Sequence, residues 1–77
     1  MKLSELPVGD RAAVVEFPGQ SQACVRLREM GVIPGTILKL VRMAPLGDPL
    51  EIQVLGYCLT LRRADADQIQ VMPSCDS

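Results

Sequence analysis

The residues of this chain that could ligate a metal or act as a nucleophile are few and far apart. Histidine, the usual general base near neutral pH and the commonest metal ligand, is absent. The three cysteines, Cys24, Cys58 and Cys75, are widely spaced and form no C-x-x-C pair. No phosphate-binding loop such as G-x-x-x-x-G-K occurs. We therefore expect no enzyme, no metal site and no cofactor, although a metal ion held by carboxylates would leave no such signature.

Charge and composition exclude further classes of function. The chain has 77 residues, with eight Lys and Arg against nine Asp and Glu and a formal net charge of -1. A nucleic-acid binder needs a basic patch, and single-strand binders add aromatic side chains on which bases stack. Phe17 and Tyr57 are the only aromatic residues. We therefore expect no nucleic-acid partner.

The length and the apolar runs indicate where the protein works. The longest uninterrupted apolar run covers residues 12–15, which is far shorter than a membrane span or the core of a signal peptide. An odd number of separated cysteines fits a reducing compartment. We expect one cytoplasmic domain over residues 1–72, without direct membrane insertion, and a flexible tail over residues 73–77.

One helix is indicated by a change in the hydrophobic period at residues 21–30. Ser21 is a suitable N-cap, and Gly31 supplies the left-handed conformation that commonly ends a helix. A single helical face collects the apolar side chains Ala23, Cys24, Leu27 and Met30. We expect this face to pack on the rest of the domain, with Cys24 acting as a small buried hydrophobe.

The remaining segments predict strands at residues 11–17, 36–42, 50–54, 57–62 and 69–71, separated by turns. Burying Leu38 and Leu40 leaves Ile37 and Val41 outward, whereas the opposite register would bury Lys39. A sheet this small covers its apolar face by curling on itself. The sequence therefore predicts a mainly β fold, a small SH3-like barrel of about five strands with one inserted α-helix and short helical turns.

Three stretches of the sequence together resemble the FeoA family. They are R-L-R-E-M-G-V-I-P-G-T at residues 26–36, A-P-L-G-D-P at residues 44–49, and L-T-L-R-R at residues 59–63 followed by Ile69. The family consists of small cytoplasmic SH3-like proteins of bacterial ferrous iron uptake that act with the membrane GTPase transporter FeoB. The same domain resembles the C-terminal module of some iron-dependent repressors. The resemblance implies an FeoB-type transporter as partner, and a weak homo-oligomer stays open.

The first two motifs carry the residues that we predict to contact this partner. An apolar centre flanked by arginines is common at interfaces, and an ordered loop with an apolar tip is a plausible recognition element. The predicted contact residues are Arg26, Leu27, Arg28, Met30, Leu46, Gly47, Asp48 and Pro49. A purely structural alternative stays open: Leu27 and Met30 would pack the helix on the barrel, and the Asp48 carboxylate would accept hydrogen bonds from nearby backbone N–H groups and stiffen the loop.

Two functions follow as expectations. The first is an accessory protein that binds the cytoplasmic part of an FeoB-type transporter and modulates its assembly or gating. The alternative is a metal-responsive SH3-like module that binds ferrous iron or another transition metal ion directly. The direction of any effect on the transporter, including its GTP hydrolysis, does not follow from the sequence.

Overall fold

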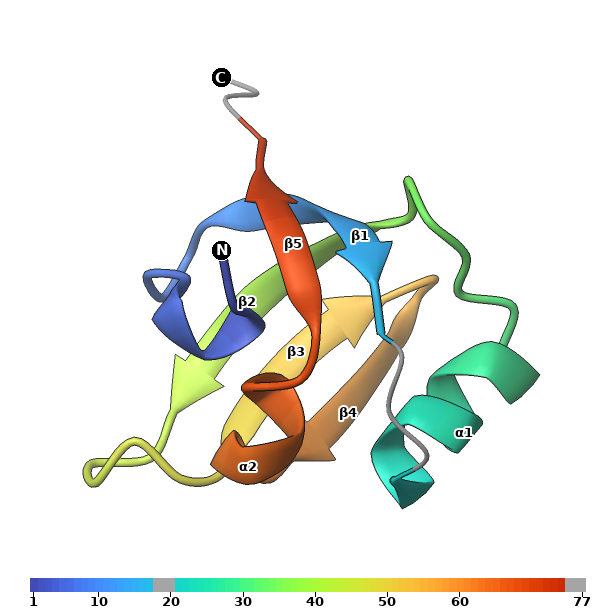
Figure 1. Cartoon of the computed structure of the whole chain (residues 1–77). Helices are drawn as coiled ribbons and strands as arrows, with labels where there is room; N and C mark the ends of the chain where they lie inside the picture. Colours follow the sequence, from blue (N-terminus) through green and yellow to red (C-terminus); the bar gives the residue numbers. More distant parts are fainter. Residues whose placement is uncertain (18–20, 75–77) are drawn as a thin grey trace.

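The chain forms one bent antiparallel sheet that wraps around an apolar core (Figure 1). The computed structural model describes residues 1–17 and 21–74. The strands are β1 (Arg11–Glu16), β2 (Ile37–Met43), β3 (Leu50–Val54), β4 (Tyr57–Leu61) and β5 (Gln70–Pro73), in the order β4-β3-β2-β1-β5. A 3₁₀ helix η1 (Leu3–Glu5) precedes β1, and the helices α1 (Gln22–Glu29) and α2 (Arg63–Ala66) complete the fold. The mainly β prediction with five strands is confirmed.

The strand registers follow the hydrophobic alternation. Leu38 and Leu40 on β2 are buried, and β3 buries Leu50, Ile52 and Val54 along the same face. Ile37 points outward with 48% of its surface exposed, as the sequence predicts. No polar or charged residue among those described is buried. The core is therefore held by apolar packing, and the sheet surrounds it.

Helix α1 begins and ends where its terminal residues predict. The Ser21 hydroxyl oxygen accepts a hydrogen bond from the Cys24 N–H at 3.3 Å, which satisfies one of the free donors of the first turn. Gly31 adopts a φ of +98°, and the Val32 N–H donates to the Leu27 carbonyl at 2.9 Å. Cys24 and Leu27 are buried, so the predicted apolar face does pack on the barrel.

Three local features differ from the sequence prediction. The segment expected as a turn after β4 is the short helix α2. Alternation along the predicted strand at residues 57–62 places Tyr57 on the same face as Leu61, but Tyr57 is 61% exposed because it lies at the turn end of an edge strand. Strand β5 extends through Pro73, and the Ser74 N–H donates to the Arg11 carbonyl at 2.9 Å, so the expected tail boundary lies too early. Residues 75–77 lie outside the described residues.

In the described part of the chain, no helix is both long enough and apolar enough to cross a membrane.

Candidate interaction surface

The loop between β2 and β3 presents an apolar side chain on a well-held backbone. Leu46 is 90% exposed at the tip of this loop, which projects from the body of the molecule (Figure 1). The Ala44 N–H donates to the Pro49 carbonyl at 3.0 Å, and the Gly47 N–H donates to the Ala44 carbonyl at 2.7 Å. These bonds close the base of the loop and form a turn near its tip. Leu46 is therefore displayed in a defined position.

The Asp48 carboxylate attaches the same loop to helix α2. Its Oδ1 accepts a hydrogen bond from the Arg63 N–H at 3.0 Å, and Arg63 is the first residue of α2. Gly47 lies against the same residue, because a Cβ built on Gly47 would lie 3.1 Å from Arg63 Nη1. Asp48 therefore has the structural role of a hydrogen-bond acceptor for a backbone N–H, although the donor lies fifteen residues away in the sequence and not nearby.

The predicted contact residues on α1 divide into exposed and buried ones. Leu27 is only 1% exposed and belongs to the core, so its prediction as a contact residue is wrong: its side chain faces the barrel. Met30 is half-buried against the core. Arg26 is exposed. Arg28 donates from Nη2 to the Phe17 carbonyl at 3.1 Å, and its guanidinium carbon lies 5.3 Å from the Phe17 ring centroid. Arg28 therefore links α1 to Phe17, directly after β1.

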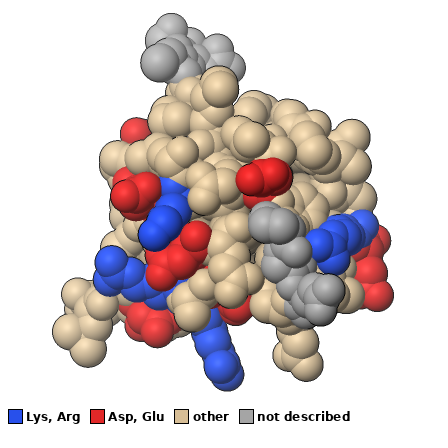
Figure 2. Space-filling model, viewed as in Figure 1, with Lys and Arg blue, Asp and Glu red and all other residues tan. Residues whose placement is uncertain are grey.

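The structure does not bring the two predicted halves into one patch. In Figure 1 the β2–β3 loop and α1 project from opposite sides of the molecule, with α2 and β4 between them. On the face shown in Figure 2, acidic and basic side chains are interspersed, and no single sign of charge dominates. A partner that contacts both Arg26 and Leu46 would therefore also cover the surface around β4 and α2.

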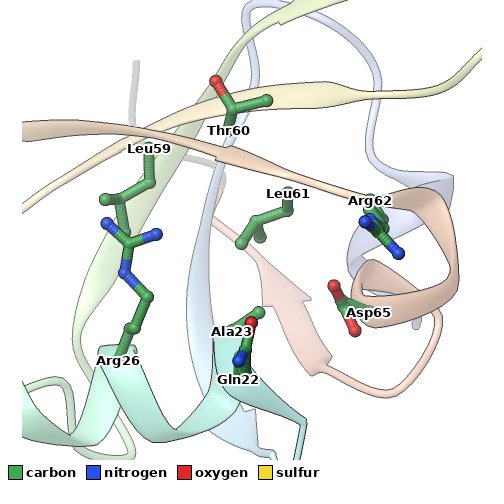
Figure 3. A pocket seen from close by; sticks show the side chains of 8 residues that line it. All are labelled: Gln22, Ala23, Arg26, Leu59, Thr60, Leu61, Arg62 and Asp65. Carbon is green, nitrogen blue, oxygen red and sulfur yellow. The ribbon is translucent and has the colours of Figure 1, made fainter.

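A groove of about 170 Å³ occupies this intermediate surface (Figure 3). Its lining comes from α1, β4 and α2 and comprises Gln22, Ala23, Arg26, Leu59, Thr60, Leu61, Arg62 and Asp65. Figure 3 shows Leu59 and Leu61 pointing from β4 toward α1, whereas Thr60 points to the opposite side of the strand. The sequence prediction included only Arg26 from this set. Of the other seven, four belong to the L-T-L-R-R motif, which was the available sequence signal for them.

The thiols and carboxylates do not gather into an evident ligand set. Across residues 1–17 and 21–74, no three side chains of Cys, Asp or Glu are placed to hold one metal ion. Cys24 is buried in the core, whereas Cys58 is exposed on β4. Cys75 lies outside the described residues.

Known proteins resemble the chain in sequence and in fold. The family model of the FeoA domain matches residues 1–73. An Fe(2+) transport protein A/Fe(2+) transporter FeoB fusion protein of Porphyromonas gingivalis is 41% identical over 71 residues, or 92% of this chain. The chain spans only 8% of the length of that fusion protein.

Two solved structures extend the comparison to the fold. The FeoA protein of Chlorobium tepidum is 44% identical with a TM-score of 0.87, and the match covers all of this chain and 74% of that one. The FeoA of Stenotrophomonas maltophilia, described as an SH3 domain protein complexed with zinc, is 33% identical with a TM-score of 0.78. That match covers 92% of this chain and 88% of the other. The motifs, the SH3-like fold and the matched family model agree, and the chain belongs to the FeoA family.

Proposed function

We propose that this chain is an accessory protein of bacterial ferrous iron uptake that binds the cytoplasmic part of an FeoB-type GTPase transporter. The observation that carries the proposal is the P. gingivalis relative, in which transport protein A and the transporter FeoB are fused in one polypeptide. A covalent link keeps two modules at a high effective concentration. The fusion places an FeoA domain next to the transporter in that relative, and this supports binding of the present chain to an FeoB-type partner.

The protein modulates the transporter by binding one of its conformations more tightly than another. Such a partner shifts the population toward the preferred conformation by no more than the difference between the two affinities. The chemistry of GTP and the path through the membrane belong to the transporter. The accessory protein supplies a surface, which agrees with a domain whose described residues carry a groove of about 170 Å³ and exposed apolar side chains.

The exposed members of the predicted contact set form the proposed surface. Leu46 is the strongest candidate because it is almost fully exposed on a loop that Asp48 attaches to α2. Arg26 belongs to α1, which projects from the opposite side of the molecule to this loop (Figure 1). Leu27 is excluded from the contact set because it supports α1 from within the core.

Affinity measurements with a leucine variant test this function. The wild-type chain, Leu46→Gln and the control Met72→Gln are titrated against the detergent-solubilised FeoB-type transporter of the same organism, loaded with GDP or with a GTP analogue. Met72 is 64% exposed on β5, away from the loop. We expect Leu46→Gln to weaken binding about tenfold, since it removes one buried leucine contact, and Met72→Gln to change it less than about twofold.

Two results would contradict the proposal at different levels. Failure of the wild-type chain to bind in either nucleotide state would overturn the transporter as partner. Binding that is equally tight for Leu46→Gln and the wild-type chain would leave the partner and remove the loop from the contact surface.

A metal-responsive module is the second candidate, and the zinc in the S. maltophilia structure is the observation that favours it. Anaerobic titration calorimetry with ferrous iron or zinc distinguishes the two candidates. Stoichiometric heat of binding to the isolated chain would support direct metal binding.

A further inference from the structure

One edge of the sheet is closed by the chain itself. Strand β5 is an edge strand, and its outward backbone groups are at residues 69, 71 and 73. The Leu3 N–H donates to the Ile69 carbonyl at 2.9 Å. Val71 is bonded twice to Met1, donating its N–H at 2.8 Å and accepting at 3.1 Å. Pro73 has no N–H to offer. No extended segment can therefore be added along β5.

The other edge, β4, is open. The β3–β4 hairpin turns through Leu55 and Gly56, both with positive φ, so Val54 and Tyr57 form its closing pair. Hydrogen-bonded and non-hydrogen-bonded pairs alternate along an antiparallel ladder. Cys58 and Thr60 therefore occupy non-hydrogen-bonded positions opposite Gln53 and Glu51, and their N–H and C=O groups point away from β3. Within residues 1–17 and 21–74, no hydrogen bond reaches these outward groups.

The groove beside this edge is lined by more positive than negative side chains, which favours an acidic partner. Leu59, Leu61 and Ala23 form its apolar floor. Arg26 lies at one end and Arg62 at the other (Figure 3), with Asp65 as the one carboxylate in the lining. In the described part of the chain, no carboxylate forms an ion pair with either guanidinium. One arginine from α1 and one directly after β4, at opposite ends of the groove, are complementary to acidic side chains spaced along an extended peptide.

We propose that β4 is a strand-addition site that binds an extended, acidic segment of the partner. The outward amides of Cys58 and Thr60 lie two residues apart, about 7 Å, which is the repeat of another β-strand. Carboxylates of the added strand would contact Arg26 and Arg62. This inference rests on the proposed function and assigns the added strand to the cytoplasmic part of the FeoB-type transporter.

Proline substitution at the edge tests the backbone bonds directly. Thr60→Pro removes an outward N–H, and proline is tolerated on edge strands where the N–H faces solvent. Thr60→Val keeps the N–H and the β-branched shape and is the matched control. We expect Thr60→Pro to weaken binding to the solubilised transporter at least about tenfold, and Thr60→Val to change it less than about twofold.

Amide hydrogen exchange at single-residue resolution supplies a second measurement that needs no substitution. In the free chain, the backbone amides of Cys58 and Thr60 should exchange rapidly, and the bound transporter should slow both at least about tenfold.

Substitution of the two groove arginines tests the charged contacts. The double variant Arg26→Gln with Arg62→Gln should weaken binding about tenfold at low salt and less at high salt, because the lost contacts are charged. Arg11→Gln, an exposed substitution on β1, is the matched control.

The outcomes separate this proposal from the function on which it rests. Absence of any binding by the wild-type chain overturns the transporter as partner and, with it, the strand addition. Tight binding that leaves both amides unprotected overturns only the strand addition. Protection that appears in the chain alone and rises with its concentration would assign β4 to a second copy of this chain and also overturn the proposal.

Discussion

At the scale of single residues, Asp48 and Leu27 show that residues predicted to contact a partner can instead support the fold. Both lie in motifs that the sequence predicts to contact a partner. Asp48 bonds to the first N–H of α2, fifteen residues further along the chain, and so orients the loop that displays Leu46. Leu27 is enclosed by the core. We therefore expect each side chain to act through the structure it supports and not by contact with a partner, and stability measurements distinguish these two roles.

Removal of the Asp48 carboxylate should lower stability modestly. Asp48→Ala leaves the Arg63 N–H without its acceptor, and the loss of such a helix-terminal bond lowers the free energy of unfolding by about 1 kcal/mol. Asp48→Asn keeps a side-chain oxygen that can accept the bond and should lose less. Urea denaturation followed by circular dichroism measures both variants. Equal stability of Asp48→Ala and the wild-type chain would show that the bond contributes nothing in solution.

At the scale of elements, the β3–β4 hairpin contains a residue in an unfavourable conformation. Leu55 has a φ of +52°, a left-handed conformation that residues with a Cβ adopt at a cost, and it is followed by Gly56 at +81°. Asn-Gly is the preferred pair for a two-residue turn of this kind. Leu55 is 49% exposed, so its side chain gains only part of the stabilisation of full burial. The turn also sets the register of β4, and thereby which amides face outward.

Leu55→Asn should therefore stabilise the domain. We expect the free energy of unfolding to rise by about 0.5–1 kcal/mol, because asparagine tolerates the left-handed conformation better than leucine. Leu55→Ala is the control, since it removes the same side chain without that tolerance and should not stabilise. Thermal and urea unfolding of the three proteins provide the measurement. A stability of Leu55→Asn below that of Leu55→Ala would contradict the assigned strain.

At the scale of the whole molecule, the contribution of a single core residue is a large fraction of the total stability. Typical domains have about 0.05–0.15 kcal/mol per residue, which amounts to about 4–12 kcal/mol for this length. The core is one apolar cluster to which the sheet, η1 and both helices contribute. Loss of one large side chain from that cluster thus lowers the stability of the whole domain, and with it the folded fraction that presents the loop and the β4 edge.

Leu27→Ala should reveal this dependence. Truncation of a buried leucine lowers the free energy of unfolding by about 2–5 kcal/mol, whereas Leu27→Met, which nearly conserves volume, should lower it by less than about 1.5 kcal/mol. Transporter binding by the folded fraction should be unchanged in both variants, because Leu27 does not reach the surface. Weaker binding by fully folded Leu27→Met would return this residue to the contact surface.

The sequence by itself determined the family, the mainly β fold and most element boundaries. The reason is that these signals are local. Alternation across a strand, the Ser21 cap and the glycine that ends α1 are each encoded within a few residues. Burial of Leu38 and Leu40 followed from the same local pattern, because only one register avoids burying Lys39.

Only the tertiary structure decided which predicted residues reach the surface and which surfaces adjoin. The Asp48–Arg63 bond and the closure of β5 by Met1 each join segments that are distant in the sequence. The separation of the loop from α1 likewise depends on how distant segments are arranged in space. No local pattern encodes such contacts, because they depend on how the sheet curls. The open edge at β4 is a property of the strand order. An edge strand and a central strand can share one alternating pattern, so the sequence could not distinguish them.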